Sequence, residues 1–100
     1  MSTLNPIGEM STKEFLQPVA ELSTVATDTF SIMLYNDDVN TFDWVIQSLV
    51  EICDHVPTQA EQCAMLVHYK GKYVVKSGEK RDMINRGMAL LDRGLTIEVI

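Results

Sequence analysis

The sequence has no apolar run near the length of a membrane-spanning helix. About 20 consecutive apolar residues are needed to cross a bilayer, and polar or charged side chains interrupt every apolar stretch of this 100-residue chain well before that length. The first residues also lack the basic flank and apolar segment of a secretory signal. We therefore expect a cytoplasmic location and no membrane partner.

Basic residues are scarce as well. Lysine and arginine together number 8 against 14 aspartates and glutamates, so the formal net charge is −6. Nucleic acids and anionic membranes attract basic protein surfaces. The charge balance therefore disfavours nucleic acid as a partner, and it is compatible with a cationic ligand.

Cysteine is limited to Cys53 and Cys63, both within helix-like segments. Free cysteines are among the most buried residue types, and disulfides are rare in a reducing cytoplasm. We predict two free, buried thiols. With His55 and His68 these cysteines form a Cys-x-His and a Cys-x4-His spacing, whereas structural zinc sites prefer paired ligands two to four residues apart. No metal or other cofactor is predicted.

The length and the apolar fraction of 46% suit a single domain with one core. The first 28 residues have weak hydrophobic periodicity and contain two prolines and a glycine. We predict a flexible extension over residues 1–28, with a short helical turn near Glu14–Leu22. A folded core domain is expected over residues 29–100.

Hydrophobic periodicity in the core alternates between strand and helix patterns in the order β-α-α-β-α-β. This order predicts an α+β fold, a two-layer single domain in which a small antiparallel sheet packs on three helices. The predicted elements are a strand over Phe30–Tyr35, a helix from Asn40 or Thr41 to about His55, a helix from Thr58 to Lys70, a strand over Lys72–Lys76, a helix over Glu79–Arg93 and a strand over Leu95–Ile100.

Capping and turn residues set these expected boundaries. Pro57 cannot continue a helix, and Thr58 with Glu61 has the form of a capping box. A turn is expected at Ser77-Gly78, and Gly94 is expected to end the last helix. The residues expected to face the core are Phe30, Ile32 and Leu34 in the first strand, then Phe42, Val45, Ile46, Leu49, Val50 and Cys53, then Ala60, Cys63, Ala64 and Val67, then Met83, Ile84, Gly87, Met88 and Leu91.

The turn Asn36-Asp37-Asp38 joins the first strand to the first helix. Adjacent carboxylates repel each other, so this pair favours a site for a cationic guest. About thirty residues later the second helix ends near His68. If that helix packs beside the turn, an imidazole joins two carboxylates and an amide next to an apolar surface. Such a site suits a primary amine attached to a hydrophobic group.

Two other interpretations of these residues are weaker. A calcium loop that starts at Asn36 would need glycine at position six and glutamate at position twelve, where Thr41 and Gln47 stand. His68 could act as a general base of a small hydrolase. No nucleophile motif such as Gly-x-Ser-x-Gly accompanies it, so the residues do not predict an enzyme.

The string YNDDVNTFDWVIQSLVEICDH, followed by QAEQCAMLVHYKGK, resembles the ClpS adaptor family of the N-degron pathway. The match is gapless from Tyr35 to Lys72. The resemblance implies the small α/β domain also seen at the C-terminus of the ribosomal stalk protein. It implies a non-enzymatic adaptor that binds destabilising N-terminal residues of substrate proteins and delivers them to the N-terminal domain of a Clp-type AAA+ unfoldase. The alternative is an interaction module of this fold without amine recognition.

The resemblance also implies roles for single residues. It assigns the α-amine of the substrate to Asn36, Asp37, Asp38 and His68, and the side-chain pocket to Asn40, Phe42, Val45, Ala64 and Val67. The segment between Val75 and Met83 is shorter than in many relatives, and Glu79, Lys80 and Arg81 are candidates there for contact with the unfoldase.

Two departures from the family pattern concern the pocket. The common Thr-Pro-Met reads Asn40-Thr41-Phe42 here, and Ala64 replaces a methionine that usually gates the pocket. These changes predict a relaxed gate that admits β-branched first residues.

Overall fold

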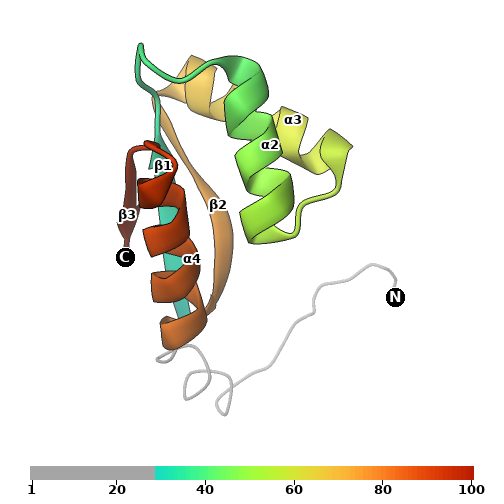
Figure 1. Ribbon diagram of the computed structural model, residues 1–100. Helices are drawn as coiled ribbons and strands as arrows, with labels where there is room; N and C mark the ends of the chain where they lie inside the picture. Colours follow the sequence, from blue (N-terminus) through green and yellow to red (C-terminus); the bar gives the residue numbers. More distant parts are fainter. Residues whose placement is uncertain (1–28) are drawn as a thin grey trace, which may run out of the picture.

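The computed structural model describes residues 29–100 (Figure 1). The predicted extension over residues 1–28, with its helical turn near Glu14–Leu22, lies outside the described residues. The element order β-α-α-β-α-β confirms the predicted α+β class. The elements are β1 (Thr29–Tyr35), α2 (Phe42–Cys53), α3 (Pro57–Lys70), β2 (Lys72–Glu79), α4 (Lys80–Asp92) and β3 (Ile97–Val99).

The sheet has β1 in the middle and antiparallel to both neighbours, in the order β2-β1-β3. Residues of β1 alternate between its faces. Ile32 and Leu34 are buried, and Ser31 and Met33 lie on the opposite, half-exposed face. Helix α4 runs along the sheet, and α2 and α3 pack against each other beside it (Figure 1). The predicted inward face of the first strand is thus confirmed.

The core lies between this sheet face and the helices. Among its residues Leu49, Met83 and Leu90 have no exposed surface. The predicted inward residues of the second helix are all buried, which confirms that helical face: Ala60, Cys63, Ala64 and Val67. Within residues 29–100, no helix combines the length and the apolar character that crossing a bilayer requires.

Strand β2 is longer than predicted, and the expected turn at Ser77-Gly78 is wrong. These residues pair with Ser31 and Phe30 of β1, and the strand passes directly into α4 through Glu79. The Glu79 carboxylate accepts a hydrogen bond from Asp82 N at 3.1 Å and caps the helix. Because the strand residue is itself the cap, no separate turn is needed.

The last strand is shorter than predicted, since β3 spans only Ile97–Val99. Leu95 does not join the sheet. Its amide donates to Leu90 O at 3.2 Å, which continues the end of α4. Gly94 has φ of +86°, a conformation that glycine adopts without strain. The backbone thus reverses at Gly94 before the strand begins.

Two helix boundaries also differ from the prediction. Helix α2 ends at Cys53 rather than near His55, because Arg86 of α4 donates to Ile52 O at 2.6 Å and to Asp54 Oδ2 at 2.9 Å. Asp54 adopts φ of 59°, and His55 turns into the protein, where its Nε2 lies 2.7 Å from Val75 O. Thr41 caps the start of α2, as one of the two predicted residues.

The predicted capping box at Thr58 is wrong as well. Helix α3 begins at Pro57, with Val56 as its cap residue, and the Gln59 side chain accepts a hydrogen bond from Val56 N at 3.3 Å. Proline fits the first helical position because the amide N–H of a residue there has no acceptor within the helix. Proline, which lacks this N–H, therefore loses no hydrogen bond. Pro57 therefore starts this helix as well as separating it from α2.

The inward face of α4 is rotated from the predicted one. Met83, Gly87 and Leu90 are buried, whereas the expected Ile84, Met88 and Leu91 are 37%, 60% and 51% exposed. Gly87 explains the rotation: a Cβ there would lie 3.0 Å from Val99 Cγ2, so the helix approaches β3 closely at that residue. Phe42 of α2, also expected inside, is 42% exposed.

The two cysteines are free and buried, as predicted. Loss of hydration on burial raises the pKa of the Cys53 thiol to about 11 and also raises the pKa of Cys63. Since the thiolate is the reactive form, we expect an aromatic disulfide reagent at pH 8 to label neither thiol rapidly in the folded protein. Both should react at once in denaturant, as measured by absorbance. Rapid labelling of the native protein would contradict the burial of these side chains.

Candidate functional site

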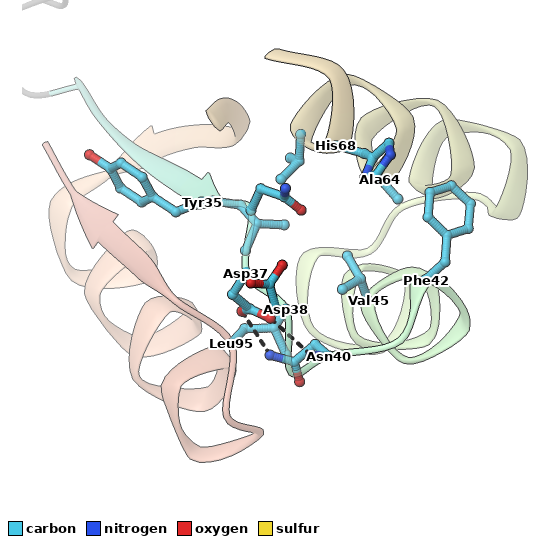
Figure 2. A pocket seen from close by; sticks show the side chains of 12 residues that line it. Tyr35, Asp37, Asp38, Asn40, Phe42, Val45, Ala64, His68 and Leu95 are labelled. Atoms are coloured by element: carbon cyan, nitrogen blue, oxygen red, sulfur yellow. Dashed lines mark hydrogen bonds between the residues drawn. The ribbon is translucent and has the colours of Figure 1, made fainter. Parts of the chain in front are cut away.

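A cavity of about 300 Å³ opens between the β1–α2 turn, the first turn of α2, the C-terminal half of α3 and the loop after α4. It contains every residue that the sequence predicted for the amine site and for the pocket (Figure 2). The lining residues are Leu34, Tyr35, Asn36, Asp37, Asp38, Asn40, Phe42, Val45, Ala64, Val67, His68 and Leu95.

Helical spacing brings the side chains of α2 and α3 to the cavity. Phe42 and Val45 are three residues apart on α2, and Ala64 and His68 are four apart on α3, so each pair shares a helix face. Figure 2 shows Ala64 and His68 above Phe42 and Val45, and Asp37 and Asp38 together on the side of the cavity that faces these two pairs. The imidazole of His68 and the paired acids thus lie around the same cavity.

The cavity floor is apolar and buried. Leu34, Ala64, Val67 and Leu95 are each at most 5% exposed. Phe42 is more exposed and stands at the opening. Leu95 is a lining residue that sequence reasoning missed, because it was expected to begin the last strand. The change from buried floor to exposed edge provides a hollow for an apolar side chain.

Three polar side chains at the cavity edge have no partner among the residues that the structure describes. Asn36, Asp38 and His68 are exposed, and within residues 29–100 their side chains form no hydrogen bond or ion pair. Within the described part of the chain, the one ring contact of His68 is an edge-to-face contact with Tyr69, at 5.3 Å between ring centroids. A carboxylate, an amide oxygen and a neutral imidazole nitrogen are all acceptors. The edge therefore offers acceptors to a ligand without breaking an internal interaction.

Asp37 is bound within the turn. Its carboxylate accepts from Val39 N and Asn40 N, each at 2.9 Å, from Asn40 Nδ2 at 2.9 Å and from Thr96 Oγ1 at 3.4 Å. These hydrogen bonds, the one from Asn40 N foremost, hold the pKa of Asp37 below its usual range. Asp37 therefore shapes the turn and adds negative charge, while the carboxylate of Asp38 has no partner within residues 29–100.

The turn is attached on both sides. Asn36 N donates to Gly71 O at the end of α3 at 2.9 Å, and Asn40 Nδ2 donates to Gly94 O after α4 at 2.9 Å. These contacts connect segments that are far apart in the sequence. They hold the cavity edge in place before any ligand binds, which reduces the entropic cost of binding.

The residues predicted to contact the unfoldase lie outside this cavity. Glu79, Lys80 and Arg81 are at the start of α4, where with Ile84 and Asn85 they line a separate surface hollow of about 390 Å³. Helix α4 has 13 residues and is about 20 Å long; the hollow lies on its first half, and the loop that carries Leu95 follows its other end. The structure therefore keeps the two predicted sites apart.

The sequence was compared with models of known protein families. The model of the family described as ATP-dependent Clp protease adaptor protein ClpS matches residues 26–97. The chain belongs to the ClpS adaptor family. ClpS proteins are adaptors of a Clp protease, and the predicted family is thus confirmed.

Individual ClpS relatives agree with this assignment. The ATP-dependent Clp protease adapter protein ClpS of Nitratidesulfovibrio vulgaris is 36% identical over 42 residues, which cover 42% of each chain. The match thus spans about two fifths of the length of this curated relative. A solved structure of Agrobacterium tumefaciens ClpS2 bound to L-phenylalaninamide aligns with a TM-score of 0.70 at 20% identity, over 73% of this chain and 95% of that one. The second likeness shows that the chain has the ClpS fold.

Proposed function

We propose that this chain binds the free N-terminus of substrate proteins whose first residue is large and hydrophobic, and delivers them to a Clp-type AAA+ unfoldase in the cytoplasm. The observation that carries the proposal is the free acceptor set of Asn36, Asp38 and His68 beside a buried apolar floor in a single cavity. The chain performs no covalent chemistry in this role.

The polar edge suits a protonated α-amine. An ammonium group has three donors and a positive charge, and Asp38, Asn36 and neutral His68 supply acceptors for it. Asp37 adds its charge, although its lone pairs are occupied within the turn. A charge-assisted hydrogen bond contributes about 1.5–3 kcal/mol. An internal residue has an amide in place of the amine, so it lacks the charge and two of the donors.

The floor suits the first side chain. Burying a large apolar side chain contributes about 1.5–3 kcal/mol, and Val67 with Leu95 provides buried contact surface at the base of the cavity. Together with the amine contacts and hydrogen bonds to the peptide backbone, this reaches about 8 kcal/mol, which corresponds to micromolar affinity. Capture of an amine combined with a pocket is a known mode of peptide recognition.

The solved relative supports the same ligand chemistry. ClpS2 of Agrobacterium tumefaciens was determined with L-phenylalaninamide, a ligand with a free α-amine and an aromatic side chain. We extend this chemistry to the present chain because the required residue types are together around its cavity.

The start of α4 is the proposed contact surface for the unfoldase. Glu79 caps the helix and Lys80 lies 5.6 Å above the Phe30 ring, whereas Arg81 has no partner within residues 29–100. This surface is at one end of α4, which is about 20 Å long, and the loop that lines the substrate cavity is at the other end. The adaptor can therefore hold both partners at once.

The proposal is tested with a short peptide that begins with Phe and the same peptide with an acetylated N-terminus. Isothermal titration should detect the free peptide, and acetylation should weaken binding by at least about tenfold, because it removes the charge and two donors. Equal binding of both peptides would exclude amine recognition.

The other two functions give different results. An interaction module without amine recognition binds neither peptide, and an enzyme releases product over time, which chromatography of the same samples detects. Only selective, stoichiometric binding of the unmodified peptide supports an adaptor.

Ala64 leads to a prediction about which first residues of a peptide the cavity accepts. Ala64 is a small residue in the buried floor of the cavity. We expect it to leave room for a branched Cβ, so peptides that begin with Ile or Val should bind within about tenfold of the Leu peptide. Ala64→Met fills this space and should weaken the Ile and Val peptides more than the Leu peptide. A peptide array that varies only the first residue measures both. Strict rejection of Ile and Val by the wild type would exclude a relaxed gate.

A further inference from the structure

We propose that Asn40 and Trp44 are positioning residues that hold the loop after α4, and through it Leu95, at the floor of the cavity. This inference rests on the proposed function, since it concerns selection of the first residue of a substrate. Trp44 is not among the residues that line the cavity, so its effect on selection would be indirect.

The geometry is a bridge of two hydrogen bonds from α2 and its cap region to consecutive carbonyls of the loop. Trp44 Nε1 donates to Arg93 O at 3.0 Å, and Asn40 Nδ2 donates to Gly94 O at 2.9 Å. The next residue is Leu95, which is 3% exposed and lines the cavity. The two donors therefore hold the backbone immediately before the floor residue.

Backbone hydrogen bonds also hold the loop on both sides of Leu95, and on the strand side Tyr35 N of β1 donates to Thr96 O at 2.9 Å. The last turn of α4 ends with hydrogen bonds from Gly94 N to Leu91 O and from Leu95 N to Leu90 O, and Gly94 is in the left-handed region. Strand β3 begins only at Ile97. The path from helix to strand thus reverses at a glycine, and the side-chain donors of Asn40 and Trp44 hold the two carbonyls that precede Leu95.

Arg93 strengthens the same contact from the loop side. Its guanidinium lies 5.2 Å above the Trp44 ring and its Nη2 is 2.7 Å from Glu51 Oε1 on α2. The indole is therefore fixed between the guanidinium and the Arg93 carbonyl. Trp44→Phe removes the indole N–H and retains a smaller aromatic ring on which the guanidinium can stack.

Asn40 also connects the floor to the charged edge. The Nδ2 that donates to Gly94 O also donates to Asp37 Oδ2 at 2.9 Å, and Thr96 Oγ1 from the other side of Leu95 approaches the same carboxylate oxygen at 3.4 Å. The amine-binding edge and the hydrophobic floor thus share an amide group. A shift of the loop changes the depth of the cavity relative to the acidic turn.

The test uses Trp44→Phe and Asn40→Ala, which remove each donor of the bridge. Ser31→Ala is the matched control, because it removes a side-chain hydrogen bond to Ser77 on the outer face of the sheet, away from the cavity. Circular dichroism melts check that each variant is folded.

The first readout needs no ligand. Loss of either donor should raise the hydrogen-exchange rate of the Leu95 amide by about three- to tenfold relative to the Leu49 amide in the core, as expected for one lost hydrogen bond. Ser31→Ala should leave this ratio unchanged. An unchanged ratio of Leu95 to Leu49 exchange rates in Trp44→Phe would overturn the positioning role, regardless of the peptide affinities.

The second readout is selection. We expect the affinity ratio of Phe-initiated to Ala-initiated peptides to fall by about three- to tenfold in Trp44→Phe. In the double variant with Leu95→Ala, the ratio should fall no further than in Leu95→Ala alone, because both changes act through the same side chain. Equal weakening of all peptides, or additive effects, would instead indicate a general structural role and overturn the proposal.

The outcomes separate the inference from the proposed function. Wild-type protein that binds no free-amine peptide, combined with faster Leu95 exchange in the variants, would refute the adaptor function and retain the bridge as a determinant of loop position. Wild-type protein that binds the free-amine peptide, combined with an unchanged ratio of Leu95 to Leu49 exchange rates in the variants, would support the adaptor function and refute the bridge.

Discussion

Replacing Asp38 by asparagine is expected to weaken binding of a Phe-initiated peptide by about 10- to 100-fold, the equivalent of one charge-assisted hydrogen bond. Asp38 is exposed, lines the cavity and has no partner within residues 29–100. Its carboxylate is therefore available to an ammonium group. Because it makes no internal contact there, the melting temperature should stay within a few degrees of the wild type.

Asp43→Asn is the control for this variant. Asp43 is an exposed carboxylate in the first turn of α2, and it is absent from the cavity lining. Both substitutions raise the net charge by the same amount, so any general electrostatic effect on the peptide is shared. Isothermal titration should show near wild-type affinity for Asp43→Asn. Similar affinities in the two variants would contradict a direct contact between Asp38 and the amine.

Replacing Asp37 by alanine is expected to reduce both stability and binding. The substitution removes the acceptor for two backbone amides of the turn and for the Asn40 and Thr96 side chains. Since these donors are partly solvated, the loss should be about 1–2 kcal/mol, which lowers the melting temperature by roughly 5–15 °C in a domain of this size. Peptide affinity should fall by about thirtyfold or more, because the charge and the shape of the edge are lost together.

The effect of Asp37 should depend on pH in a defined direction. The pKa of this carboxyl is lowered in the folded protein, so its stabilising contribution is complete above the ordinary aspartate range and is lost as the pH falls through the lowered value. The difference in melting temperature between wild type and Asp37→Ala should narrow between about pH 5 and pH 2. A constant or growing difference on acidification would show that the hydrogen bonds do not favour the charged form.

The distinction between the two aspartates could not be made from the sequence. Asp37 and Asp38 are adjacent and chemically identical, and the resemblance assigned both to the amine. The structure shows that Asp37 accepts hydrogen bonds from the turn and from Thr96, far along the chain. Local sequence does not reveal such a contact, because it depends on the packing of the α4–β3 loop against the turn.

Helix α4 illustrates a second limit. The hydrophobic periodicity predicted an inward face made of Met83, Ile84, Gly87, Met88 and Leu91. In the structure Leu90 is buried instead, whereas Ile84, Met88 and Leu91 are exposed. A 3.6-residue repeat with apolar residues on two sides fits more than one rotation. The close approach at Gly87 to β3 selects the actual one, and that approach involves a strand formed ten residues later.

What the amino-acid sequence determined by itself is the order of the elements, two candidates for the cap of α2 (Asn40 and Thr41) and the buried face of α3. Its resemblance to the ClpS family indicated the side chains around the cavity other than Leu34, Tyr35 and Leu95. The element order and the buried face of α3 follow from local spacing, because residues three or four apart on a helix, or alternate residues on a strand, share a face. The tertiary structure decided which acid is free, how α4 is rotated and that Leu95 completes the floor. Those properties arise from hydrogen bonds and packing between distant segments, which no local pattern encodes.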